Sequence, residues 1–71
     1  MTADELLERY AARVGVPAPT PAERETLLAM AGVAAHASER LAAPLACWMA
    51  GRAGLAPQEA ARLVREVVDG A

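Results

Sequence analysis

Residues 33–52 read VAAHASERLAAPLACWMAGR, and this segment contains the only His, the only Cys and the only Trp of the chain. It also contains an internal proline, Pro44. In a continuous helix the proline ring would collide with the carbonyl of Arg40 and remove one hydrogen bond, at a cost of about 3 kcal/mol. The segment therefore predicts a helix that breaks near residues 41–43 and a new helix with Pro44 in its first turn.

The flanking segments carry clear signals for where helices begin. Thr2 and Thr20 each precede a Glu by three residues, which is the pattern of a capping box. Pro21 and Pro57 stand where a first helical residue is expected, and proline is favoured there. Apolar residues recur at helical spacing and no segment alternates with period two. The sequence predicts a single all-α domain over 1–71, a compact bundle of four short helices near 3–14, 21–41, 44–53 and 57–69.

The large apolar side chains are few for a chain of four helices, although 55% of the residues are hydrophobic. A chain this short buries only about 60% of its unfolded surface, so its core is marginal. Gly32 and Gly51 lie among small residues, and we expect Gly32 to permit the close approach of another backbone. The sequence therefore predicts a homodimer or a complex with a protein partner that covers part of the apolar surface.

Composition argues against several classes of partner. The net charge is −2, and the seven basic residues, all Arg, are mixed with acidic ones rather than clustered as nucleic acid binding requires. No apolar run reaches the roughly 18 residues of a transmembrane helix, and the acidic start does not resemble a signal peptide. We expect a cytoplasmic protein that binds neither nucleic acid nor a membrane.

The sequence contains no pattern typical of an enzyme acting alone. It has no Gly-rich phosphate loop, no Ser nucleophile elbow and no paired Cys motif. Eleven residues of helix would separate His36 from Cys47 by about 16 Å, so we expect Cys47 to be a small buried side chain rather than a nucleophile. One His and one Cys cannot supply the four ligands of a zinc site. We predict no catalytic residue, no metal and no cofactor.

Two groups of residues remain as candidate sites. His36 and Arg40 are four residues apart, hence on one helical face, and Pro44 continues the same line. An imidazole beside a guanidinium could bind an anion or a phosphate. In the alternative, Arg40 binds helix carbonyls and His36 donates to a loop carbonyl. Trp48 and Met49 belong by default to the core, but they could instead form an exposed anchor for a partner.

The residues Ala35, His36, Arg40, Ala43, Pro44, Leu45 and Gly51 resemble a pattern found in a small helical family of unknown function from high-GC bacteria. Members occur alone or as a tail on domains similar to molybdenum cofactor guanylyltransferase. The family is expected to have a hydroxyl residue and an aromatic after the Pro-Leu pair, whereas this chain has Ala46, Cys47 and Trp48. The resemblance implies a link to molybdenum cofactor biosynthesis, with a nucleotidyltransferase as a candidate partner, and it implies no activity.

Two hypotheses follow from these observations. The first is a non-catalytic accessory or protein-interaction domain that uses Trp48 and Met49. The second is a small anion-binding or phosphate-binding module that uses His36 and Arg40. Exposure distinguishes them, because an open pocket around His36 and Arg40 supports the second and an exposed patch at Trp48 and Met49 supports the first. The sequence favours the first.

Overall fold

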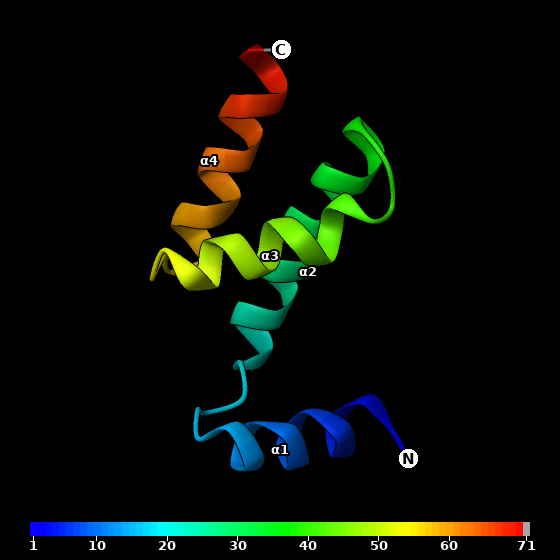
Figure 1. The fold of residues 1–71 in the computed structure, drawn as a ribbon, viewed down its shortest axis with the longest axis vertical. Helices are drawn as coiled ribbons and strands as arrows, with labels where there is room; N and C mark the ends of the chain where they lie inside the picture. Colours follow the sequence, from blue (N-terminus) through cyan, green and yellow to red (C-terminus); the bar gives the residue numbers. More distant parts are fainter. Residues whose placement is uncertain (71) are drawn as a thin grey trace.

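The computed structural model describes residues 1–70, which fold into four helices and contain no strand. Figure 1 shows the helices in chain order: α1 (Ala3–Val14), α2 (Pro21–Ala37), α3 (Ala42–Arg52) and α4 (Pro57–Gly70). The predicted all-α class and the number of helices are therefore confirmed.

Both predicted capping boxes are present and begin α1 and α2. The backbone N–H of Glu5 donates to Thr2 Oγ1, and that of Glu23 donates to Thr20 Oγ1, each over 3.1 Å. In return, the Thr20 N–H donates to Glu23 Oε1 over 2.9 Å. Each box satisfies backbone donors that a helix N-terminus otherwise leaves free, so the starts of these helices are encoded locally.

The break between α2 and α3 lies earlier in the chain than expected. Helix α2 ends at Ala37 rather than near residue 41, because the backbone of Ser38 leaves the helical region and its hydroxyl donates to the carbonyl of Ala34 over 3.0 Å. Helix α3 starts at Ala42, and Pro44 lies in its first turn as predicted. Residues 38–41 therefore form a short connection where the sequence predicted the last turn of a helix.

The core forms where α3 and α4 both pack against α2. Its centre is Met30 of α2, which is only 3% exposed and lies against Ala50 of α3 and Ala60 of α4. Helices α3 and α4 touch each other over a small area, and in Figure 1 they diverge from a common end. The two helices share α2 as a support, and side chains of α2, α3 and α4 line a groove between them.

The close backbone approach expected at Gly32 is absent within the chain. A Cβ atom added at Gly32 or at Gly51 would meet no heavy atom within 4 Å. Within the chain no backbone therefore approaches Gly32 closely, and an approach by a second chain stays a prediction. The small residues that do allow close packing are the alanines of α3 and α4.

Helix α1 lies apart from the other three helices, across the N-terminal end of α2 (Figure 1). It ends at Gly15, whose φ of 81° is the left-handed conformation that glycine tolerates best. A salt bridge of 2.6 Å joins Asp4 of α1 to Arg24 of α2. Much of the apolar side of α1 is left uncovered, and its exposed large residues are Leu6, Tyr10 and Val14.

Candidate functional site

Helix α3 turns its small side chains toward the core. Ala46 and Cys47 are half-buried and pack with the buried Ala50 against the cluster around Met30. Small side chains let the backbones of two helices approach closely, which explains why this side of α3, rather than its bulky side, contacts α2. The position of Cys47 agrees with the expected structural role.

The bulky side of α3 faces solvent. Trp48 is 65% exposed and Met49 is 64% exposed, and Leu45 beside them is exposed as well. The default expectation that Trp48 and Met49 are core residues was therefore wrong, and the alternative of an exposed anchor describes their position. The guanidinium of Arg52 lies over the Trp48 ring, 5.7 Å from its centroid, a cation–π contact worth about 0.5–1 kcal/mol at an exposed site.

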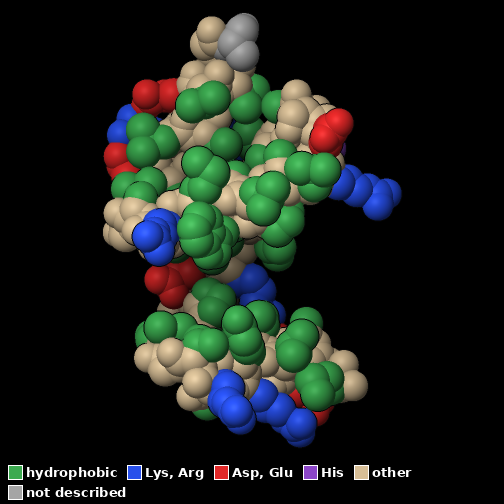
Figure 2. Space-filling view, viewed as in Figure 1, with side chains coloured by type: hydrophobic (Ala, Val, Ile, Leu, Met, Phe, Trp, Pro, Cys, Tyr) green, Lys and Arg blue, Asp and Glu red, His purple; other side chains and the backbone are tan. Residues whose placement is uncertain are grey.

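An apolar groove continues this surface between α3 and α4. It consists of two hollows of about 290 and 470 Å³ that share Val64 and Val67 of α4 as lining residues. The first hollow also includes Met49, so the groove is continuous with the bulky side of α3. Val67 is 72% exposed although it belongs to the apolar stripe of α4. We call Leu45, Trp48 and Met49 together with this groove the α3–α4 face; hydrophobic side chains cover its visible part in Figure 2.

Val64, Val67 and Val68 recur at helical spacing as one amphipathic stripe, but this pattern does not show that they line a groove. A signal was present in α3, which has apolar residues on both its small and its bulky side. A helix in a three-helix unit cannot bury both sides against the same neighbours. An excess of apolar surface could therefore have been inferred, although its place on α4 could not.

His36 and Arg40 do not lie on one helix. His36 is an exposed residue of the last turn of α2, and Arg40 is exposed in the connection that follows. The first turn of α3 offers few donors for an anion, because the N–H groups of Ala42 and Ala43 already donate to the carbonyls of residues 39 and 40 and Pro44 has none. Neither His36 nor Arg40 lines the groove between α3 and α4 or the smaller hollow beside the N-terminal end of α2. The anion-binding hypothesis stays a prediction, with less geometric support than the α3–α4 face.

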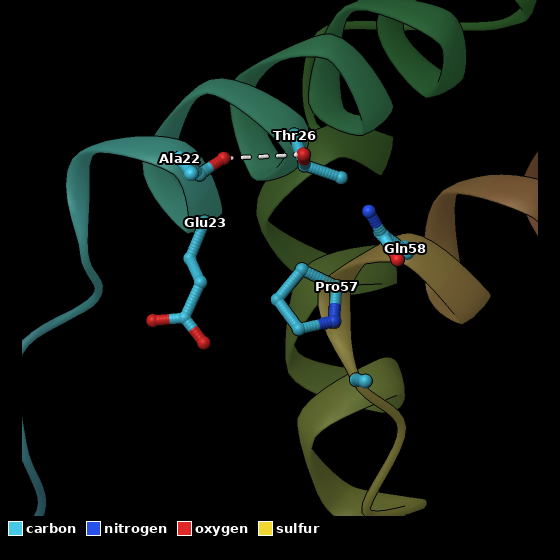
Figure 3. Close-up of a pocket in the computed structure, with 6 residues that line it drawn as sticks. Ala22, Glu23, Thr26, Pro57 and Gln58 are labelled. Atoms are coloured by element: carbon cyan, nitrogen blue, oxygen red, sulfur yellow. Dashed lines mark hydrogen bonds between the residues drawn. The ribbon is translucent and has the colours of Figure 1, made fainter.

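A third, smaller hollow of about 220 Å³ lies where the N-terminal ends of α2 and α4 meet (Figure 3). Pro57 and Gln58 of α4 face Glu23 and Thr26 of α2 across it. The carboxylate of Glu23 belongs to the capping box, and the Thr26 hydroxyl donates to the Ala22 carbonyl over 3.2 Å. These polar groups form hydrogen bonds with the backbone at the start of α2, and they do not indicate a ligand-binding site.

The charged side chains form local pairs on the outer surface. Arg62 of α4 pairs with Glu59 and with Glu66 on the same helix. The hydrogen bond from Arg62 holds the pKa of Glu59 below its ordinary value, and the same contact raises the pKa of Arg62. Within residues 1–70, His, Cys, Asp and Glu side chains do not gather in groups of three that could hold a metal ion.

Each helix of the described chain is too short or too polar to cross a membrane.

Together, the fold and the α3–α4 face define a small all-α domain with a large uncovered apolar surface. The chain belongs to the family of a domain of unknown function, DUF6457, whose model matches residues 1–71. The expected membership in a family of unknown function is thereby confirmed, whereas its association with molybdenum cofactor enzymes stays a prediction. Searches of curated proteins and of solved structures found no match to this chain.

Proposed function

We propose that this chain is a non-catalytic protein-interaction domain that binds a partner helix on its α3–α4 face. The observation that carries the proposal is the exposure of Trp48 and Met49 on α3, where Met49 also lines an apolar groove. Tryptophan is enriched among the residues that dominate binding energy at protein interfaces. An exposed apolar patch with an adjoining groove is typical of a surface that a partner covers.

The chemistry of the groove supports a helix as the bound element. None of the residues that line its two hollows is ionised, and Ser38 is the only one with a polar side chain. The groove runs along α4 from Ala60 to Val68, about 12 Å at 1.5 Å per residue, which matches two turns of an amphipathic helix. Helix-in-groove binding uses apolar anchors at this spacing and needs no buried charge.

A photo-crosslinking amino acid at Met49 tests this proposal in living cells. With the crosslinker at Met49 we expect adducts with one dominant protein, identified by mass spectrometry, since Met49 joins the exposed side of α3 to the groove. The matched control carries the same crosslinker at Arg65, which is exposed and lines neither hollow. Equal or absent labelling at the two positions would contradict an interaction surface at the α3–α4 face.

The resemblance at His36, Arg40 and Pro44 supplies one partner to test by name. We propose a link to molybdenum cofactor biosynthesis through a guanylyltransferase-like nucleotidyltransferase, because the resemblance implies that related chains occur as tails on such domains. The purified chain is titrated with that enzyme while the emission of Trp48 is followed. A saturable spectral change that Met49→Glu abolishes supports the link, and an unchanged spectrum at high enzyme concentration removes it without affecting the general proposal.

A further inference from the structure

We infer that the helix bound in the groove is α1 of a second copy of this chain, so that two copies form a reciprocal dimer; this inference rests on the function proposed above. Two apolar surfaces are uncovered in the isolated chain, the α3–α4 face and one side of α1. Within residues 1–70 of one chain, the groove has no helix bound in it, and the apolar side of α1 has no surface that covers it.

Helix α1 needs a covering surface for its own stability. It has 12 residues, and helices of that length are marginal in water when nothing packs against them. Its apolar side is flanked by one charged residue, Arg13, which follows Leu6 by seven residues, whereas Glu5 and Glu8 project from the opposite side of the helix. Tyr10 in the middle of this side is 63% exposed. A helix with this pattern is expected to be bound by an apolar groove.

The dimensions of the two surfaces match. The apolar side of α1 extends from Leu6 to Val14, about 12 Å along the helix axis, which is the same length as the groove between Ala60 and Val68. The groove lining contains no ionised side chain, and Arg13 at the margin of the apolar side of α1 can keep its guanidinium in water, so no charge would be buried without a partner when the surfaces meet.

The surface area of the chain supports a second copy. A compact monomer of 7.4 kDa has an accessible surface of about 4,200 Å², whereas this chain exposes 5535 Å². The excess of about 1,300 Å² exceeds the roughly 800 Å² per partner that a stable specific interface buries. The uncovered surface is therefore large enough for a dimer interface.

The arrangement of the helices permits a closed dimer. The molecule is 38 Å long, and α1 lies at one end of this axis with α3 and α4 toward the other. Figure 2 shows hydrophobic side chains on the same side of the molecule at both ends. A two-fold axis perpendicular to the long axis would lay α1 of each copy on the α3–α4 face of the other, which is a self-complementary interface.

Sedimentation of the full chain over a wide range of concentrations tests the inference. The wild type is expected to reach twice its 7.4 kDa mass. Tyr10→Glu and Met49→Glu are each expected to raise the dissociation constant at least about 30-fold, because each places a charge at the centre of an apolar contact. Ala12→Glu is the matched control, since it adds the same charge to the exposed opposite side of α1 and is expected to leave dimerisation unchanged.

Mixing two variants identifies the contact directly. When the Tyr10→Glu chain is mixed with a Met49→Lys chain, one interface pairs Glu with Lys and the other is wild type, so a mixed dimer is expected at concentrations where each variant alone is monomeric. A wild-type monomer at millimolar concentration would overturn the inference. So would a dimer that is lost with Met49→Glu but insensitive to Tyr10→Glu, because α1 would then not be the bound element. A crosslink from Met49 to a different protein would preserve the proposed function while rejecting the second copy.

Discussion

Helices α1 and α4 have the same kind of sequence and different surroundings. Both are short amphipathic helices, with 12 and 14 residues, and both carry one apolar stripe opposite a charged side. Helix α4 packs part of its stripe against α2, while α1 is joined to α2 by a salt bridge and exposes most of its stripe. An amphipathic pattern thus predicts that one side of a helix is covered, but it does not predict which surface covers that side.

The largest expected effect contrasts the two methionines of the three-helix unit. Met30→Ala is expected to lower the free energy of unfolding by about 2–4 kcal/mol, because Met30 is buried at the junction of α2, α3 and α4. Met49→Ala is the same change at an exposed position, and in dilute solution it is expected to cost less than about 0.5 kcal/mol. Urea denaturation measures both. Equal losses would contradict the described core.

The two capping boxes allow the stability contribution of α1 to be compared with that of α2. Thr20→Ala is expected to lower the free energy of unfolding of the three-helix unit by about 1 kcal/mol, because α2 is its central element. Thr2→Ala removes the equivalent bond from α1 and is expected to reduce helix content with little change in that free energy. Circular dichroism combined with urea denaturation separates the two outcomes. A larger effect at Thr2 would show that α1 belongs to the cooperative core.

Helix starts could be predicted from the sequence because their causes are local. The pairs Thr2 with Glu5 and Thr20 with Glu23 form within one turn, so both partners of each interaction lie within four consecutive residues. The end of α2 was harder to predict. The steric effect of Pro44 indicates only where a helix cannot continue, whereas the earlier end at Ala37 depends on the backbone and hydroxyl of Ser38.

The exposure of the α3–α4 face could not be predicted from periodicity. Helix α3 is apolar on both sides, and whether Ala50 or Trp48 faces α2 depends on how closely the two helices can approach. That is a property of tertiary packing between segments far apart in the chain. The sequence identified Trp48 and Met49 as candidate residues, and the structure was needed to place both at the surface and to place Met49 in the same hollow as Val67.

Replacing two glycines by alanine is expected to change stability by smaller amounts, and in opposite directions. Gly32→Ala is expected to stabilise α2 by up to about 1 kcal/mol, since alanine favours a helix interior and its Cβ would meet nothing within 4 Å. Gly54→Ala is expected to destabilise the connection before α4, because Gly54 has a φ of 74° that alanine adopts with strain. Thermal unfolding distinguishes the two signs. A destabilised Gly32→Ala variant would indicate that another backbone packs there in solution.

The smallest expected effect is electrostatic and lies on the outer side of α4. Because the folded-state pKa of Glu59 is lowered, mainly by the hydrogen bond from Arg62, its stabilising contribution is present above the ordinary pKa of 4.5. That contribution is lost as the pH falls through the folded-state value. Both side chains are exposed, so the loss is expected to be small and screened by salt. Urea denaturation across this pH range should show a weaker pH dependence in Glu59→Gln than in the wild type.

The emission of Trp48 at increasing protein concentration tests the interaction surface most directly, because Trp48 is the only tryptophan and lies on the α3–α4 face. We predict the long-wavelength emission of a hydrated indole in dilute solution. We further predict a shift to shorter wavelength as the chain associates, with the same midpoint as the change in mass and at higher concentration in Tyr10→Glu. An emission maximum that stays at long wavelength up to millimolar concentration would contradict a second copy on this face.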